Sequence, residues 1–287
     1  MGIAFAFAAL AFWGVGDFLV QRSTRRFGDW ITLFFIEGFA TFVMAPFVWH
    51  ELPALFASPY ELALLFGTSA VLLVAAVIDF ESLRVGKLAV VEPIYALEVP
   101  VAAVLGGIFV GEVLSGVQLA LTLVLVGAIM LLATKSLRDW RHVRAERGVW
   151  LAIIAALAMG TANLLFGIGG RAAGPLMVNW FASVFVFLVS SMYLAATGRL
   201  REIRRDWSSN KRLIVSVSIL DKAGWIAYTS SMLYIPIAIA TALSEAYIAL
   251  AALLGMLVNH ERLATHQRVG LAGAVIAVIF LATVTGS

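Results

Sequence analysis

Six ionisable side chains lie deep inside long apolar stretches of this chain. They are Glu37, Glu92, Glu98, Asp221, Lys222 and Glu245. In a lipid bilayer, each charge near the centre of a helix costs about 2.5 to 3.5 kcal/mol on insertion scales. Together they would cost on the order of ten kcal/mol or more unless they are paired, protonated or hydrated. Because a water-filled cavity supplies hydration, we expect these side chains to surround one.

The fourth apolar stretch is the richest in such groups. Glu92, Tyr95 and Glu98 are spaced by three residues, so on a helix they spread over about a third of the circumference. Pro93 directly follows Glu92 and Pro100 lies two residues after Glu98, and each proline removes a backbone donor and kinks a helix. Glu98 lies too deep to pair with the basic residues before the stretch, which favours a functional role. Glu92 fits a functional role and a structural ion pair equally well.

The eighth stretch places aromatic side chains beside charged ones. Asp221, Trp225 and Tyr228 follow the i, i+4, i+7 spacing of one helical face. Lys222 is adjacent and points about 100° away. It would neutralise a carboxylate on a neighbouring helix, bind an anionic group of a substrate, or belong to an internal ion network that only locks helix packing. Trp13 lies inside the first stretch and is expected to face the cavity.

Other polar residues in the apolar stretches are expected to have simpler roles. Asp17 and Asp79 lie near Arg22 and Arg84, and salt bridges are the favoured interpretation. Asn163 would either line an outer vestibule or form an interhelical hydrogen bond, which is common in membranes.

The residues that most metal and cofactor sites need are missing from the apolar stretches. The chain has no cysteine, which excludes disulfides, thiolate catalysis and cysteine metal sites. Its four histidines lie at the ends of apolar stretches, and no glycine-rich phosphate loop is present. We therefore expect no metal and no cofactor. The loops are too short to hold a catalytic domain, so we do not expect an enzyme.

Membrane-spanning helices are needed to position these side chains. Hydrophobic residues make up 62% of the 287 residues and charged ones 13%, about half the charged fraction of a soluble domain. The chain divides into ten apolar stretches, each close to the roughly 20 residues that a spanning helix needs. The sequence therefore predicts an all-α integral membrane protein with ten transmembrane helices.

Basic residues mark alternate gaps between these stretches. Eighteen of the 20 Lys and Arg residues fall in the odd-numbered gaps, whereas Arg171 lies in an even-numbered gap and Lys222 inside a stretch. Cytoplasmic loops carry the excess of Lys and Arg. We therefore expect cytoplasmic basic loops and both termini on the non-cytoplasmic side of a prokaryotic-type inner membrane. The basic surface suits membrane lipids with anionic headgroups and does not indicate nucleic acid.

Short motifs recur in the two halves of the chain at nearly constant offsets. They are Gly111-Glu112-x5-Gln118 with His260-Glu261-x5-Gln267 (offset 149), Trp13-Gly14-x2-Asp17 with Met159-Gly160-x2-Asn163 (offset 146), and residues 83–86 with 233–236 (offset 150). Each half holds five helices, and because five is odd the second half must be inverted. The predicted organisation is a repeat over 1–135, a basic cytoplasmic linker over 136–147 and an inverted repeat over 148–287.

This inversion relates the ninth stretch to the fourth. Ser244, Glu245 and Tyr247 occupy the region that corresponds to residues 94–98. We expect Glu245 to approach Glu98 near the middle of the membrane. Two carboxylates that close cannot both ionise cheaply, so one is expected to hold a proton. The excess of acids over Lys222 in the core favours a substrate with an amine or another cationic group.

The ordered set of motifs resembles the drug/metabolite transporter (DMT) superfamily, specifically its paired EamA-type repeats. The resemblance covers roughly residues 3–134 and 149–283 and is carried by Trp13-Gly14 and by the Gly111-Glu112 and His260-Glu261 turns. It implies that helices one to four and six to nine enclose a central cavity. It also implies that helices five and ten pack outside and contact a partner subunit if one is present, so that the protein is a monomer or a homodimer.

These features together predict a secondary active transporter for a small polar metabolite such as an amino acid or an amine. It would work by alternating access and would be linked to protons through the buried carboxylates. Two alternatives remain open at this stage: a flippase for a lipid or a lipid-linked sugar, and a membrane scaffold that transports nothing. A flippase needs a lateral opening toward lipid. A scaffold would show closed ion pairs without a cavity.

Overall fold

The computed structural model describes residues 1–86, 91, 94–134, 147–250 and 263–286. The predicted site residue Glu92, the neighbouring Pro93, nearly all of the predicted linker and the His260-Glu261 turn lie outside the described residues. The described part of the chain is entirely helical, as the composition predicts.

Helices follow one another with short connections. They are α1 (Gly2–Phe27), α2 (Asp29–Val48), η1 (Trp49–Glu51), α3 (Leu52–Ala57), α4 (Pro59–Val85), α6 (Glu98–Phe109), α7 (Gly116–Ala133), α8 (Arg147–Ala173), α9 (Pro175–Ala196), α10 (Leu200–Ser231), α11 (Ile237–Glu245) and α13 (Thr265–Gly286).

Seven helical segments of the described chain are long and apolar enough to cross a membrane. They are Gly2–Phe27, Asp29–Ala57, Pro59–Val85, Gly116–Ala133, Gly148–Ala173, Pro175–Ala196 and Thr265–Gly286. The other three predicted stretches contain the shorter apolar helices α6 and α11 and the more polar α10. α10 begins with a charged segment and bends at Asn210, where φ is −138° and ψ is 25°. The chain is therefore an integral, multi-pass membrane protein.

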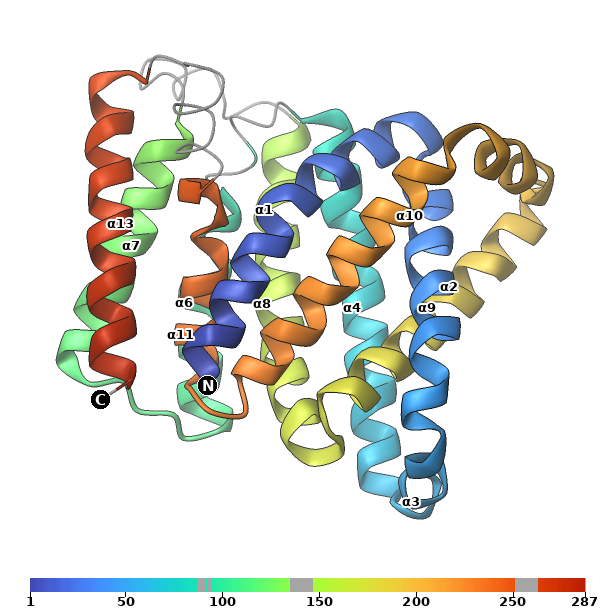
Figure 1. Ribbon diagram of the computed structural model, residues 1–287, viewed down its shortest axis with the longest axis horizontal. Coiled ribbons are helices and arrows are strands. Elements are labelled where there is room, and N and C mark those ends of the chain that lie inside the picture. Colours follow the sequence, from blue (N-terminus) through green and yellow to red (C-terminus); the bar gives the residue numbers. More distant parts are fainter. Residues whose placement is uncertain (87–90, 92–93, 135–146, 251–262, 287) are drawn as a thin grey trace.

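The helices stand side by side and pack around two large buried apolar clusters and a smaller third one of Phe27, Ile31, Phe35, Leu194 and Ile214. In Figure 1, α7 and α13 lie together at one end of the molecule, and both chain termini lie toward the same ends of the helices. One large cluster joins α7 and α13 to parts of α1, α6, α10 and α11. The other large cluster joins α2, α4, α8 and α9. Trp225 packs against both clusters, so α10 forms a bridge between them.

The fourth and ninth stretches are interrupted at matching places. Ala96 and Leu97 form a turn before α6, and Ala246 ends α11 before the helix resumes. At both places the hydrogen bonds tighten from i−4 to i−3, as in Leu97 N to Ile94 O (3.0 Å) and Ala249 N to Ala246 O (2.9 Å). Pro100 accounts for the first interruption, because it has no N–H for the carbonyl of Ala96. These two turns place Glu98 and Glu245 at helix ends.

Pro236 lies at the start of a helix in the ninth stretch and does not bend it. It precedes the first residue of α11 and has the extended angles φ −54° and ψ 143°. A proline there starts a helix without removing any hydrogen bond inside it.

The antiparallel helices α7 and α13 are joined by glutamines at their two starts. The Gln118 side chain accepts from Ser115 N at 3.0 Å and donates to Thr285 Oγ1 at 3.4 Å, at the end of α13. The Gln267 side chain accepts from Ala264 N at 3.0 Å and donates to Leu132 O at 3.2 Å, at the end of α7. Each glutamine therefore caps its own helix and holds the last turn of the other.

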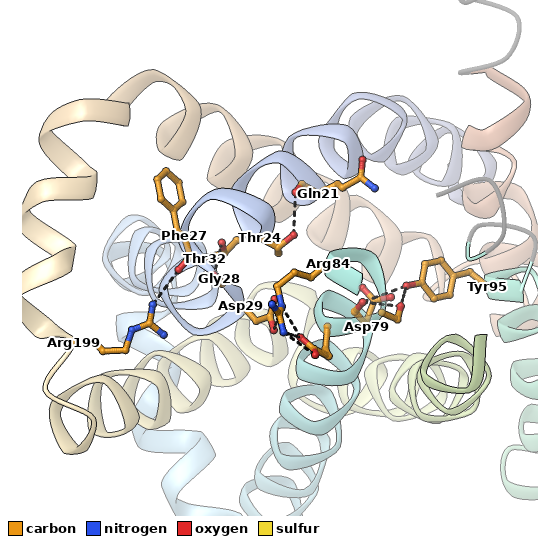
Figure 2. Close-up of polar contacts among 12 residues, drawn as sticks. Gln21, Thr24, Phe27, Gly28, Asp29, Thr32, Asp79, Arg84, Tyr95 and Arg199 are labelled. Atoms are coloured by element: carbon orange, nitrogen blue, oxygen red, sulfur yellow. Dashed lines mark hydrogen bonds and ion pairs between the residues drawn. The ribbon is translucent and has the colours of Figure 1, made fainter. Parts of the chain in front are cut away.

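Arg199 connects two turns at one end of the molecule. Gly28, between α1 and α2, has φ 82°, in the left-handed region that favours glycine. Arg199 Nη2 donates to Phe27 O at 3.3 Å, as Figure 2 shows, and pairs with Glu202 at 2.9 Å. The hydrogen bond from Arg199 holds the pKa of the exposed Glu202 carboxyl below its usual value.

Candidate functional site

A cavity of about 100 Å³ lies between the two large apolar clusters, with room for several water molecules. Its wall is formed by α1, α2, α4, α8 and α10 and by the residues around the two interrupted stretches. Five carboxyl groups line it: Glu37, Asp79, Glu98, Asp221 and Glu245. No lysine or arginine is among the described residues of this wall. The sequence prediction of an acidic interior therefore corresponds to one continuous space.

Glu98 is held in the cavity by α8. Its Oε2 accepts a hydrogen bond from Asn163 Nδ2 at 3.1 Å, and Glu98 is only 7% exposed. Gly160, one turn earlier on α8, lets the two helices approach. A Cβ built at Gly160 would lie 3.1 Å from Glu98 O and would overlap Val101. The glycine of the repeated motif thus sets the distance that makes the Asn163–Glu98 contact possible.

Lys222 lies between two of the carboxylates. Its Nζ is 2.7 Å from Glu37 Oε1, on α2, and 3.3 Å from Asp221 Oδ2 on its own helix. All three side chains are at least four-fifths buried. Lys222 is not among the residues that line the cavity, whereas its two partners are. These contacts match two of the three roles that the sequence allows for Lys222, namely neutralising a carboxylate on a neighbouring helix and forming an internal ion network with Asp221 and a glutamate.

The aromatic side chains pack in an edge-to-face cluster along α1 and α10. Trp13 lies 5.5 Å from Trp225 and 5.1 Å from Tyr228 between ring centroids, and Phe166 lies 4.7 Å from Trp225. Trp13 and Trp225 line the cavity, but Tyr228 does not. Tyr228 is fully buried, with its hydroxyl 2.6 Å from Thr241 Oγ1. It supports the wall rather than facing the space.

Tyr95 and Asp79 lie together on the cavity wall. The Tyr95 hydroxyl bonds to Ser82 Oγ and donates to Asp79 O at 3.3 Å, so it links the fourth stretch to α4. Figure 2 shows this contact separated from the cluster around Arg84. Both residues line the cavity.

The sequence-based pairing of Asp79 with Arg84 is wrong. Arg84 pairs with Glu81 at 2.6 Å and with Asp29 at 3.8 Å. Asp79 lies five residues earlier on the helix and faces the cavity. Sequence proximity misled here, because residues five apart on a helix point in clearly different directions. Asp79 is therefore a cavity residue that the sequence analysis missed.

A second group that the sequence analysis missed lies at the start of α11. Glu112 pairs with Arg171 at 2.6 Å and accepts from Ile237 N at 2.8 Å. Arg171 also donates to Met232 O at 2.9 Å. Arg171 stood out as the lone basic residue in an even-numbered gap, and Glu112 belongs to a repeated motif. Those signals identify both residues but do not connect them.

The described residues contain no group of three or more His, Cys, Asp or Glu arranged to hold a metal ion. The carboxylates are instead spread around the wall on different helices. The fold and the cavity together define a multi-pass helical membrane protein that encloses an acidic, aromatic-lined space.

Comparison with protein families assigns this membrane protein to a family. The model of the EamA-like transporter family matches residues 1–134 and 146–283, nearly the whole chain. The chain therefore belongs to the EamA-like transporter family, and its class is that of transporters rather than enzymes. This confirms the resemblance to paired EamA repeats of the DMT superfamily.

The fold is also that of solved structures. One crystal structure, described only as "Crystal structure of protein", matches with a TM-score of 0.73 at 13% identity, covering 99% of this chain and 95% of the other. In all, 28 solved chains match. No curated protein sequence matches this chain significantly.

Proposed function

We propose that the protein is a secondary active transporter that moves a small polar solute by alternating access around the acidic cavity. The observation that carries the proposal is the single space lined by five carboxyl groups and by Trp13, Tyr95 and Trp225. Carboxylates hold a cationic group, and aromatic rings attract cations and pack on apolar parts of a solute. An amine or an amino acid fits this chemistry best.

The proposed architecture is ten transmembrane helices in two inverted five-helix repeats, over 1–135 and 148–287 with a linker between them. The packing pattern supports it, because the most extensive helix contacts recur between the corresponding helices of the other half. α1 packs on α10 as α8 packs on α4, α1 on α11 as α8 on α6, and α2 on α10 as α9 on α4. The pairs α2–α9, α6–α11 and α7–α13 each join a helix to its own counterpart.

Small details follow the same symmetry. Gly160 packs near Glu98 O, and Gly14, its counterpart in the first repeat, packs near Tyr247 O. Tyr247 and Glu98 are 149 residues apart, which is the offset of the repeated Glu and Gln motifs. Two related halves around one cavity provide the two equivalent packings that alternating access needs.

Proton linkage is proposed to run through Glu98 and Glu245. Both are buried, both line the cavity, and both lie at the interruptions of their stretches. A cation that binds between the two carboxylates competes with protons for the same negative charge. Glu37 and Asp221 are already balanced in part by Lys222, so Glu98 and Glu245 are the better coupling pair.

The test has two stages. Purified protein is screened by thermal shift against amino acids, amines, sugars, nucleotides and cationic drugs at acidic and at neutral pH. A ligand at 100 times its Kd stabilises the fold by about 2.7 kcal/mol. Any stabilising solute is then followed in proteoliposomes with an imposed pH gradient. We expect a hit among amines or amino acids that weakens at acidic pH, and uptake driven by the gradient.

Glu98→Gln is the decisive variant, and Glu51→Gln is its matched control, because Glu51 is exposed on η1. Glu98→Gln should fold and lose proton-driven uptake, while Glu51→Gln should transport normally. Normal transport by Glu98→Gln would show the mechanism to be wrong. If no solute stabilises the protein and lipid scrambling is seen instead, the flippase alternative replaces it.

A further inference from the structure

A polar hollow at the end of α1 lies outside the acidic cavity. It is lined by Phe18, Gln21, Arg22, Arg25 and Arg26. The three arginines are exposed, and residues 18, 22, 25 and 26 follow the spacing of one helical face. None of these five residues lines the acidic cavity, so the proposed transport does not account for them.

The arginines of this hollow lack carboxylate partners among the described residues. Among the described contacts, none of its arginines pairs with a carboxylate, and Arg25 makes only a 3.4 Å hydrogen bond to Gly86 O. By contrast, Arg84, Arg171 and Arg199 each pair with a glutamate.

The amide of Gln21 provides an independent sign of a missing ligand. Gln21 is only 7% exposed, and its Nε2 is buried without any hydrogen-bond partner. Figure 2 shows its side chain extending away from the Asp29–Arg84 cluster. A buried donor without an acceptor costs about 1 to 3 kcal/mol, so an acceptor bound beside it would be favoured.

We propose that this hollow binds the phosphate group of an anionic phospholipid. Guanidinium groups match phosphate oxygens in geometry as well as charge. The arginine side chains are exposed, so a phosphate can bind among them and also accept a hydrogen bond from the Gln21 amide behind them. Phe18, one turn deeper on the same face, is 61% exposed and contacts the first acyl carbons. That apolar neighbour favours a lipid over free phosphate, although both have the same phosphate chemistry.

The test compares lipids on the purified full-length protein. Melting temperature is measured against increasing phosphatidylglycerol, phosphatidylcholine or inorganic phosphate. We expect stabilisation by phosphatidylglycerol alone. Apparent affinity should fall about tenfold in Arg22→Gln/Arg26→Gln and about threefold in Gln21→Leu, which keeps every charge. Melting without added lipid checks that each variant folds.

Arg201→Gln/Arg204→Gln is the matched control, because both residues are exposed on the charged start of α10 and lie outside the hollow. It should keep wild-type affinity. Equal losses of apparent affinity in the two double variants would mean that general surface charge causes the effect, and this would overturn the site. Unchanged binding in Gln21→Leu would also overturn it, because the amide is part of the site. Equal protection by inorganic phosphate would overturn the lipid assignment and assign the hollow to a free anion.

Discussion

Lys222 has two acidic neighbours from different helices, and this limits what it can do. Its Nζ lies 2.7 Å from Glu37 and 3.3 Å from Asp221, so its charge is balanced by carboxylates of the protein itself. The second oxygen of Glu37 is buried without a partner, so the group still has capacity for one more donor. Lys222 therefore sets the charge of one side of the cavity without facing the cavity itself.

Lys222→Ala should lower stability by about 3 to 5 kcal/mol at neutral pH, because it leaves two buried carboxylates without their counter-ion. Lys211→Ala, an exposed lysine on the same helix, is the control and should melt like the wild type. Thermal unfolding at neutral pH measures both variants. A Lys222→Ala protein as stable as the control would mean that the ion network has no structural role.

Helix interruptions and helix contacts together give the buried carboxylates their positions. Pro100 lies four residues after Ala96, at the point where the fourth stretch changes its hydrogen bonding. On α8, Gly160 lets the helix come close enough for Asn163 to reach Glu98. The site thus depends on backbone distances between elements as much as on the acidic residues.

Gly160→Ala tests this distance. The added Cβ would overlap Val101 and approach Glu98 O, and overpacking of this kind costs about 1 to 3 kcal/mol. Gly67→Ala is the control, since nothing lies within 4 Å of a Cβ there. We expect Gly67→Ala to melt at or slightly above the wild-type temperature and Gly160→Ala clearly below it. Identical melting of the two variants would contradict close α6–α8 packing.

Glu112 should be important for the start of α11. Glu112→Ala removes the pair with Arg171 and the acceptor for Ile237 N. We expect a loss of about 1 to 3 kcal/mol, because the buried N–H of Ile237 is left without its acceptor, whereas Arg171 keeps its hydrogen bond to Met232 O. Glu51→Ala, which removes an exposed carboxylate, should have little effect. Hydrogen exchange at residues 237–240 gives a local measure, and unchanged exchange there would oppose this role of Glu112.

At the scale of the whole molecule, the proposed inverted symmetry makes a prediction about sidedness. α7 and α13 are antiparallel, because the start of each contacts the end of the other. This arrangement and the charge pattern both require the chain to cross the membrane an odd number of times between the end of α7 and the end of α13. The two ends should therefore lie on opposite sides of the membrane, with the C-terminus non-cytoplasmic.

Fusions of a fluorescent protein that matures only in the cytoplasm test this prediction. A fusion after Thr134 should fluoresce, and a fusion after Gly286 should be dark. Alkaline phosphatase fusions at the same two positions should give the reverse pattern. The same signal at both positions would rule out two inverted five-helix repeats.

The sequence by itself determined the membrane class, the family and most of the acidic residues of the cavity. Burying a charge in lipid is so costly that Glu37, Glu98, Asp221 and Glu245 stand out without a structure. Family membership followed from the ordered motifs and is confirmed by the match over nearly the whole chain.

Only the tertiary structure decided which neighbours these groups have. It shows Asp79 on the cavity wall instead of in a salt bridge with Arg84, and it pairs Lys222 with Glu37. It also shows that Tyr228 does not line the cavity. It also joined Glu112 to Arg171 across 59 residues of chain. Composition and spacing determine that a buried charge needs a partner. The partner lies on another helix, and its identity depends on helix rotation and close packing, which no single-helix pattern contains.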